Sequence, residues 1–451
     1  MWRRSRGAGP PGSRADGFLG RRRFLQGTAA LALGLGTAGA GACGPPPPGA
    51  GTPLKFWNLF NGGDGARMVE LVEAFRQARP GTPVQATTLA WGTPYYTKLA
   101  MAAAGGRAPD VAVLHLSRLA GYAPAGLLDP FDPDLLAEFG LTAAAFPATA
   151  WARAQHQGRV YALPLDTHPL VLFYNTEICG RAGLLGPDGR LKPMRGEEQV
   201  LDAFRAAKQA GAQQGLVMAV SADINPWRLF WTLYRQQGGE LFDPSATRLM
   251  LEEAKALRAL RFLRALTVES GVARGDVNNN AAVAMFGSGQ AGFFWNGEWE
   301  LPTFVEQDTP FDVIPFPAIY DTAGVHGDSH ALVLPHRDDR DPARTRVALD
   351  FARFLLQHSL TWAKGGHIPA YRPVAESTAY AELGPAARYA SAAADLELDP
   401  PCWFGGAASD LQNRAGAVFS QVCAGGLSPE AAIGEFSSAM RALLATPRPQ
   451  L

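Results

Sequence analysis

The sequence predicts an α/β fold from three observations. The chain has 451 residues, which is enough for two or three structural units. Apolar residues make up 47% of the chain and aromatic residues 10%, which supports a large core. Apolar runs of strand length alternate with segments in which apolar residues recur at helical spacing. This alternation predicts parallel sheets with right-handed crossover helices.

The predicted elements follow one another in a regular order. Residues 54–60 are an apolar run that predicts a buried strand, and the turn Gly62-Gly63-Asp64-Gly65 ends it. A helix with regularly spaced apolar residues follows and ends at Pro80-Gly81. By the same criteria we expect strands at 84–91, 110–114 and 217–220, and helices at 95–104, 201–210, 226–237, 254–266 and 343–356.

Three polar interruptions predict where the chain crosses between two lobes. Residues 166–169 separate two apolar segments, and similar breaks occur at residues 324–330 and 365–369. Three such crossings make a cleft with hinges at its base. Sheets of this kind bind ligands beyond the carboxyl ends of their strands. We expect lobe 1 to comprise residues 53–165 and 324–364, and lobe 2 residues 166–323 and 365–451.

The charge balance argues against nucleic-acid binding. Charged residues make up 18% of the chain, with 41 Lys and Arg against 41 Asp and Glu. Residues 1–42 hold seven of the arginines and one aspartate, so the rest has 34 basic and 40 acidic side chains. The main body is therefore mildly acidic.

Residues 1–43 are predicted to be an export signal. Arg21-Arg22-Arg23-Phe24-Leu25 precedes an uncharged stretch of Ala, Leu and Gly, an arrangement that resembles a twin-arginine signal, with a Sec signal as the alternative. Ala40-Gly41-Ala42-Cys43 resembles a lipobox, which predicts a lipid on Cys43, whereas ordinary cleavage would leave the thiol free. Residues 44–52 form a Pro/Gly tether. We therefore expect a lipid-anchored protein on the extracytoplasmic face of the membrane, in the periplasm or at the cell surface.

The remaining cysteines indicate neither a metal site nor a cofactor. Cys179, Cys402 and Cys423 show no Cys-x-x-Cys spacing, and we expect no metal ion and no cofactor. Two alternatives stay open, a disulfide between Cys402 and Cys423 or three buried free thiols.

Several motifs resemble those of a known family. They are Phe60-Asn61-Gly62-Gly63-Asp64-Gly65, the stretch from Leu163 to Pro169, Met285-Phe286-Gly287-Ser288-Gly289, Asn296-Gly297-Glu298-Trp299, Asp328-Ser329-His330 and Gly365-Gly366-His367-Ile368-Pro369. In this order they resemble the extracellular solute-binding proteins of family 1, the sugar-binding lipoproteins of ABC importers. The resemblance implies a type II periplasmic-binding-protein fold. It also implies a monomer that captures a carbohydrate by lobe closure, performs no chemistry, and delivers its ligand to permease subunits.

Candidate ligand residues follow from what a sugar needs. A sugar ring has an apolar face for aromatic stacking and a rim of hydroxyls for hydrogen bonds. Tryptophans at expected loop positions are candidates, although each also suits a core: Trp91, Trp227, Trp299 and Trp403. The polar candidates are Asp64, Asp166, Asn296, Ser329, His330 and Arg372.

Two of the polar assignments carry a structural alternative. Asp64 is slightly favoured as the N-cap of the first helix, and His330 suits a buried core histidine equally well. Asn296 is placed in a loop that emerges from a core strand. Asn278-Asn279-Asn280 is interpreted as a surface turn, not as part of the site.

Other functions have weaker support in the sequence. A binder of another polar solute, such as a polyol phosphate, would show a basic cleft. A secreted glycosidase would need two carboxylates at a fixed separation, and the candidates for this pair are Glu298 and Asp166. No Gly-x-Ser-x-Gly or His-Glu-x-x-His motif is present. A scaffold lipoprotein would lack aromatic residues in its cleft.

Overall fold

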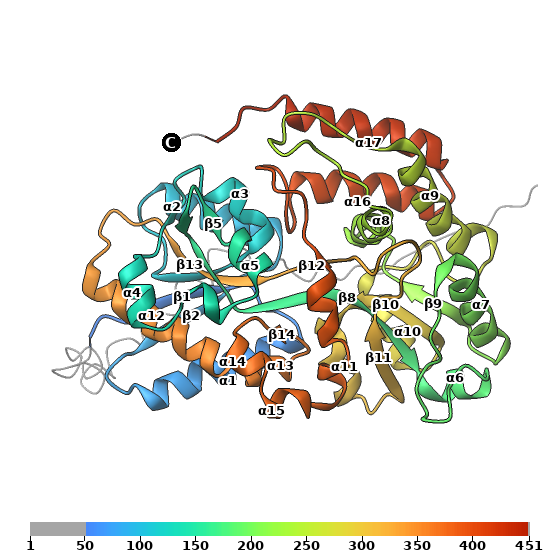
Figure 1. Cartoon of the computed structure of the whole chain (residues 1–451), viewed down its shortest axis with the longest axis horizontal. Helices are drawn as coiled ribbons and strands as arrows, with labels where there is room; N and C mark the ends of the chain where they lie inside the picture. Colours follow the sequence, from blue (N-terminus) through green and yellow to red (C-terminus); the bar gives the residue numbers. More distant parts are fainter. Residues whose placement is uncertain (1–50, 450–451) are drawn as a thin grey trace, which may run out of the picture. The chain divides into compact units, whose positions relative to one another are not determined.

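The structure is a computed structural model that describes residues 51–449, which form two mixed β-sheets with helices packed around them (Figure 1). The predicted α/β fold is confirmed. The predicted export signal, Cys43 and nearly all of the tether lie outside the described residues. Within the described residues, no helix is both long and apolar enough to cross a membrane.

The first sheet is built around strands from the first half of the chain. Strand β1 pairs in parallel with β2 and β3, whereas β13 runs antiparallel to β3. Its strands are β1 (Leu54–Asn58), β2 (Val84–Thr88), β3 (Val111–His115), β4 (Leu128–Asp129), β7 (Ala162–Pro164) and β13 (His330–Pro335).

The second sheet is centred on the long strand β8 (Asp166–Asn175), whose ten residues are all buried. Strands β9 and β10 are parallel to each other, and β10 is antiparallel to β8. The other strands are β9 (Gln214–Met218), β10 (Ala291–Gly297), β11 (Phe311–Pro315), β12 (Val325–Asp328), β14 (Ile368–Pro369) and β15 (Leu396–Glu397).

Both sheets are mixed, so the expectation of purely parallel sheets is wrong. The parallel pairs β1–β2, β1–β3 and β9–β10 have helices between their strands, as the strand–helix alternation predicted, and β12 also pairs in parallel with the distant β15. The antiparallel pairs involve β8 and β13, which begin where the chain arrives from the other sheet. The crossover rule applies to consecutive strands of one sheet. It does not determine the direction of a strand that follows a strand of the other sheet.

The chain passes between the sheets at three crossing segments. Only residue 165 separates β7 from β8, and only residue 329 separates β12 from β13. The third crossing runs from helix α13 (Ser359–Ala363), which packs on the first half, to β14, which pairs with β8. These are the three places where the polar interruptions occur in the sequence. The precise limits of the two lobes stay a prediction.

Helices cover the sheets, and the buried side chains form distinct hydrophobic cores. One core contains Phe56, Leu114 and Trp362, and another contains Leu172, Trp227 and Phe436. The longer helices are α1 (Gly63–Ala78), α2 (Thr93–Ala104), α7 (Gly196–Gln209), α8 (Asn225–Gln236), α9 (Glu253–Arg264), α10 (Asn279–Gly287), α12 (Pro342–Gln357), α16 (Asp410–Cys423) and α17 (Pro429–Leu444).

The remaining elements are short. They are α3 (Leu119–Tyr122), α4 (Pro133–Glu138), α5 (Ala148–Arg153), α6 (Thr176–Arg181), α11 (Leu301–Glu306), α14 (Arg372–Ala375), α15 (Thr378–Ala381), β5 (Gln155–His156) and β6 (Arg159–Val160).

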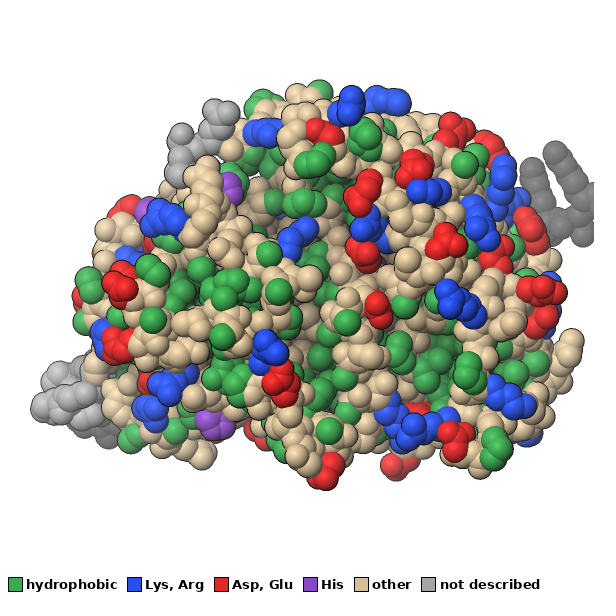
Figure 2. Space-filling model, in the orientation of Figure 1, with side chains coloured by type: hydrophobic (Ala, Val, Ile, Leu, Met, Phe, Trp, Pro, Cys, Tyr) green, Lys and Arg blue, Asp and Glu red, His purple; other side chains and the backbone are tan. Residues whose placement is uncertain are grey.

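The structure also shows how the surface charges are distributed and whether the cysteines are paired. Acidic and basic side chains are interspersed over the face shown in Figure 2, without a large patch of one sign. Cys179, Cys402 and Cys423 are all buried and free, which decides between the two alternatives left open above.

Candidate ligand-binding site

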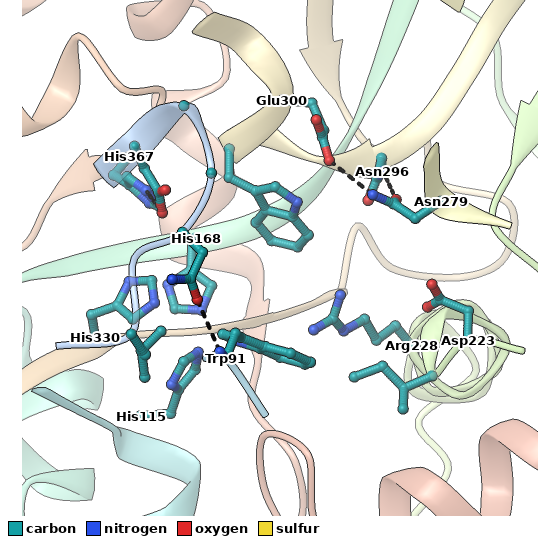
Figure 3. Close-up of a pocket in the computed structure, with 17 residues that line it drawn as sticks. Trp91, His115, His168, Asp223, Arg228, Asn279, Asn296, Glu300, His330 and His367 are labelled. Carbon is teal, nitrogen blue, oxygen red and sulfur yellow. Dashed lines mark hydrogen bonds and ion pairs between the residues drawn. The ribbon is translucent and has the colours of Figure 1, made fainter. Parts of the chain in front are cut away.

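A cavity of about 350 Å³ lies where the two sheets and the crossing segments meet (Figure 3). Its size falls in the range of small-molecule sites. Loops beyond β1, β2 and β3 supply one wall, the crossings supply histidines, and the α8, α10 and β10 region supplies the opposite wall. The lining residues are Leu59, Asn61, Gly62, Gly63, Asp64, Trp91, His115, His168, Asp223, Ile224, Arg228, Asn279, Asn296, Trp299, Glu300, His330 and His367.

Asp64 lines the cavity and does not cap helix α1. The helix begins at Gly63, and its N-cap Gly62 has no side-chain capping bond, so the expected capping role is wrong. Instead, Asp64 Oδ2 lies 3.6 Å from His367 Nε2, and the carboxylate side chain is 13% exposed. Burial alone would raise the pKa of Asp64, but the contact with His367 outweighs it and lowers that pKa. Asp64 is therefore a charged acceptor at the cavity wall.

Two indoles flank the cavity. Trp91, 40% exposed, follows β2, and its backbone N–H donates to Asn61 Oδ1 at 2.9 Å. Trp299 follows β10, and the Arg228 guanidinium lies 5.2 Å from its ring centroid. A Cβ on Gly297 would collide with the Trp299 ring, so this indole can fold back over the strand end because residue 297 is glycine. Trp91 and Trp299 provide flat apolar surfaces on two sides of the cavity.

Side-chain amides and a carboxylate form a polar rim. Asn296 Nδ2 donates to Asn279 Oδ1 at 2.8 Å, and Asn279 Nδ2 donates to Glu300 Oε1 at 3.3 Å (Figure 3). Asn296 lies within β10, not in an emerging loop, because the strand extends to Gly297. Asn279 begins α10 and is part of the cavity, so its interpretation as a surface turn is wrong. Burial raises the pKa of Glu300.

Arg228 is the cation of the second wall. It lies on α8, and in Figure 3 its side chain extends into the cavity. Its Nε makes no hydrogen bond with any described residue. Burial lowers the pKa of this guanidinium, but Asp223 and other acids favour its charged form. Arg228 therefore has donors to offer to a ligand.

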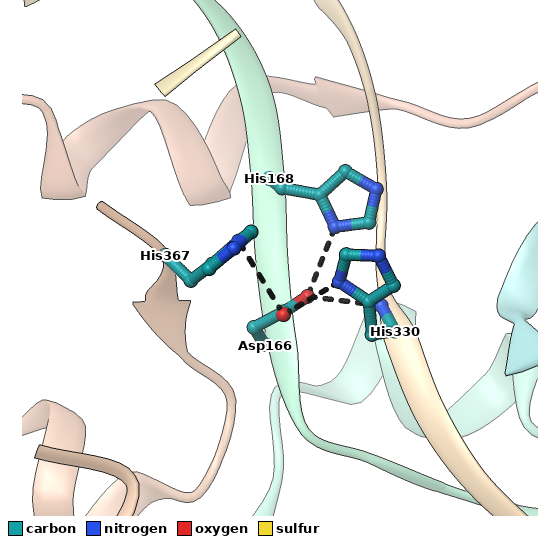
Figure 4. A group of neighbouring side chains, drawn as sticks. All are labelled: Asp166, His168, His330 and His367. Atoms are coloured by element: carbon teal, nitrogen blue, oxygen red, sulfur yellow. Dashed lines mark hydrogen bonds and ion pairs between the residues drawn. The ribbon is translucent and has the colours of Figure 1, made fainter. Parts of the chain in front are cut away.

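A buried group that we name the crossing cluster borders the cavity: Asp166, His168, His330 and His367 (Figure 4). Its three histidines line the cavity, whereas Asp166 lies beneath them. Asp166 Oδ1 is 3.0 Å from His168 Nδ1, and Oδ2 is 2.8 Å from His330 Nδ1. The Trp362 indole donates to the same carboxylate at 2.6 Å. Asp166 and His168 are on β8, His330 starts β13, and His367 precedes β14, so the cluster unites all three crossings.

The charges in the crossing cluster are unequal. Burial alone would lower the pKa of His367, but Asp166, Asp64 and Glu298 outweigh it and raise that pKa to about 10. Burial lowers the pKa of His168 to about 3, and it raises that of Glu298 to about 7. His367 also stacks on Trp362, with ring centroids 4.3 Å apart.

Five of the ten predicted ligand residues line the cavity. These are Asp64, Trp91, Asn296, Trp299 and His330. Asp166 and Ser329 are fully buried in the crossings and do not appear in the cavity wall formed by the described residues.

The other three predicted residues lie elsewhere in the molecule. Trp227 is fully buried in the core of the second half, where its indole donates to Asp399 at 2.9 Å. Arg372 pairs with Glu376 one helical turn away, at 2.9 Å. Trp403 lines a different cavity, and the Arg448 guanidinium lies 4.9 Å from its ring centroid. These residues were predicted because they lie near proline or glycine turns. That position does not show whether a side chain lines the cavity.

Several lining residues were not predicted from the sequence. His115 ends β3, Asp223 lies shortly before α8, and Glu300 immediately precedes α11, and none belongs to a recognisable motif. His168 and His367 lay in the predicted crossings, so crossing position was a usable signal for them. Arg228 could be found only once the orientation of α8 was known.

Comparison with known proteins identifies the family. Residues 61–359 match the family model described as "Bacterial extracellular solute-binding protein". The GacH receptor of Streptomyces glaucescens, solved unliganded and with acarbose, has a TM-score of 0.73 at 21% identity, over 87% of this chain and 98% of that one.

Two further solved structures share the fold. Maltose-bound MalE3 of T. maritima has a TM-score of 0.74 at 18% identity, covering 87% of this chain and 99% of that one. UgpB of Mycobacterium tuberculosis, in complex with glycerophosphocholine, has a TM-score of 0.72 at 19% identity, covering 87% of this chain and 99% of that one. These neighbours have the predicted type II periplasmic-binding-protein fold. The chain belongs to the bacterial extracellular solute-binding proteins.

Proposed function

We propose that this chain captures a sugar or oligosaccharide outside the cytoplasm and delivers it to an ABC-type importer. The observation that carries the proposal is the composition of the cavity. Trp91 and Trp299 offer stacking faces, while Asp64, Asn279 and Asn296 offer acceptors and donors within reach of the same space. The solved relatives with acarbose and maltose support the same ligand class.

Capture follows from the position of the cavity. Its lining comes from both sheets and from the crossings between them, so a ligand bound there contacts both predicted lobes. A ligand that makes more contacts in the closed arrangement shifts the population toward closure. The permease subunits would then recognise the closed pair. The proposed lobes are residues 53–165 with 324–364, and 166–323 with 365–451.

The nature of the charges favours a neutral ligand over a phosphate. Among the lining residues, Arg228 is the one Lys or Arg side chain, whereas three lining residues are carboxylic acids: Asp64, Asp223 and Glu300. An anionic group would meet more negative than positive side chains. The complex of UgpB with glycerophosphocholine keeps a phosphate-containing ligand as the second candidate, but the basic cleft that such a ligand favours is not formed by these lining residues.

We propose further that the chain performs no chemistry on its ligand. The pair Glu298 and Asp166, which a glycosidase would use, is fully buried and does not line the cavity. Neither carboxyl group can then reach a glycosidic bond in the cavity. The family consists of binding proteins, which agrees with this proposal. Incubation with α- and β-linked glucans should release no products over hours.

The cellular placement rests on the N-terminal sequence. We propose export by the twin-arginine route and a lipid on Cys43, with the folded chain a monomer at the outer face of the membrane. Mass spectrometry of membrane-extracted protein should find Cys43 as a diacylated N-terminus. A Cys43→Ser variant found free of the membrane would agree, whereas wild type without lipid would exclude the anchor.

A thermal-shift screen of the purified chain tests the ligand class. The panel contains maltose, longer maltodextrins, other neutral sugars, glycerophosphocholine and glycerol phosphate. A ligand raises the melting temperature by mass action. At least one neutral carbohydrate should do so, and Trp299→Ala should reduce the shift. A response to the phosphates alone would reject the sugar proposal in favour of the second candidate.

A further inference from the structure

The crossing cluster has a composition that sugar binding does not require. Asp166, His168, His330 and His367 each offer one ligand-type atom, and these four atoms all lie within 4.8 Å of one another. In Figure 4 the three imidazoles surround the single carboxylate. His367 Nδ1 is 3.5 Å from Asp166 Oδ2, and the other two histidines are closer still. All four side chains are buried.

One member of this cluster, His367, and its neighbour Glu298 lack hydrogen-bond partners. Both ring nitrogens of His367 and both carboxylate oxygens of Glu298 make no hydrogen bond with any described residue, although both residues are fully buried. His367 Nδ1 lies 2.9 Å from Glu298 Oε1, so the two groups are in contact but poorly aligned. Buried polar groups without partners are rare in folded proteins and call for an explanation.

We propose that Asp166, His168, His330 and His367 form a binding site for a divalent transition-metal ion of the zinc class. Three imidazole nitrogens with one carboxylate oxygen are a donor set that Zn²⁺ accepts, whereas Mg²⁺ and Ca²⁺ prefer all-oxygen sites. Their donor atoms already converge before any ion is considered. The expectation of no metal rested on the absence of Cys-x-x-Cys spacing and of a His-Glu-x-x-His motif. Neither pattern can detect a site built from histidines at three distant positions.

Neighbouring residues supply the support that such a site needs. A metal-bound histidine usually directs its second ring nitrogen at a carboxylate. Asp64 Oδ2 lies 3.6 Å from His367 Nε2 and can take this role. A Cβ on Gly366, whose φ is +99°, would collide with the carbonyl of Glu298, so this close approach depends on glycine.

Other histidine–carboxylate contacts in the described residues are simpler. His336 meets Asp129 at 2.7 Å, and its side chain is 40% exposed. His326 meets Asp399 at 3.2 Å in the core. Each brings one histidine to its carboxylate. The crossing cluster brings three, and an ion there would tie together all three connections between the sheets.

The proposal does not depend on sugar binding, because its test counts metal ions. The purified chain is stripped with a chelator, dialysed against ZnCl₂ at low micromolar concentration, and analysed by atomic emission. We expect about one zinc ion per chain. Calorimetry should then give at least tenfold weaker zinc affinity for His168→Gln and for His330→Gln. His336→Gln, a change at the exposed pair, should bind zinc like wild type.

Two measurements keep the outcome interpretable. Circular dichroism of each metal-free variant shows whether it is folded, and the wild-type zinc content tests the site even if a variant is not. Cobalt(II) adds a spectroscopic readout, since its visible absorption depends on its ligands and should change in His330→Gln. Wild type that retains no zinc, or folded variants with wild-type zinc affinity, would overturn the proposal. In that case the cluster is a charge network alone.

Discussion

Two buried aspartates have similar surroundings but different places in the molecule. Asp166 accepts a hydrogen bond from the Trp362 indole at 2.6 Å and contacts His330 at 2.8 Å. Asp399 accepts one from the Trp227 indole at 2.9 Å, and, like Asp166, it also contacts a histidine. In both cases burial would raise the pKa of the carboxyl group, but the facing histidine outweighs it and the pKa is lowered.

The difference lies in what the partners touch. His168 and His330, the partners of Asp166, line the cavity, whereas Trp227 and His326, the partners of Asp399, lie in the core. A buried aspartate with an indole and a histidine as partners therefore supports the binding site in the case of Asp166. In the case of Asp399 it supports the packing of the core. Three comparisons between matched residues and one pH series can break or sharpen this distinction.

The largest effect is expected from removing either carboxylate. Asp166→Ala and Asp399→Ala should each lower the free energy of unfolding by about 3–5 kcal/mol, because each leaves buried donors unpaired. Only Asp166→Ala should also weaken ligand binding tenfold or more, since it frees two histidines of the cavity. Urea unfolding and calorimetry measure the two effects. Equal ligand affinity in both variants would show that Asp166 supports the fold alone.

Two tryptophans give the next comparison. Trp227→Ala should lower the free energy of unfolding by about 3–5 kcal/mol and leave the affinity of the folded protein unchanged, because this indole is fully buried. Trp299→Ala should weaken ligand binding tenfold or more, roughly 1.4 kcal/mol, with less effect on stability. The reverse pattern would place the ligand at Trp227, as the sequence also allowed.

Neighbouring asparagines give a smaller pair of effects. Asn278 caps α10 by accepting from the N–H of Ala281 at 3.0 Å, and Asn278→Ala should cost about 1 kcal/mol of stability. Asn279→Ala should instead reduce ligand affinity by about 1 kcal/mol, because it removes a member of the polar rim. Thermal unfolding and calorimetry distinguish the two. Loss of affinity in Asn278→Ala alone would contradict the assignment of the rim.

The smallest effect is expected for the loss of stability at low pH that depends on Asp399. The pKa of Asp399 is lowered from its ordinary value of 3.8, so its contribution to stability is complete above that value and is lost as the pH falls below it. Asp399→Asn should be less stable than wild type at neutral pH, but should lose less stability between about pH 4 and pH 2. Urea midpoints across this range provide the check. Parallel curves for the two proteins would mean that Asp399 is not held in its charged form.

Much of the fold could be predicted from the sequence, because apolar spacing determines elements of five residues or more. Helix α8 was expected at residues 226–237 and is found at Asn225–Gln236. The two-residue strands β4, β14 and β15 carry no such pattern, since they form only through pairing with distant strands. The antiparallel pairs in the two sheets were not predicted either, because they also join strands that are distant in the sequence.

The site was predicted less completely, for a physical reason. Asp64 and Trp299 were found because their loops follow strands that point at the cavity. Trp227 was misplaced because a residue at a helix start can face either way, and here it faces Asp399. The crossing cluster joins Asp166 to His330, which lies 164 positions further along the chain, and no local pattern contains that information.

Calorimetric titration of the purified chain with neutral maltodextrins and other sugars tests the central claim most directly. We predict saturable binding of one carbohydrate per chain, weakened at least tenfold in Trp299→Ala and unchanged in the folded fraction of Trp227→Ala. Heat from glycerophosphocholine but from no sugar, or a sugar affinity that Trp299→Ala leaves intact, would contradict it.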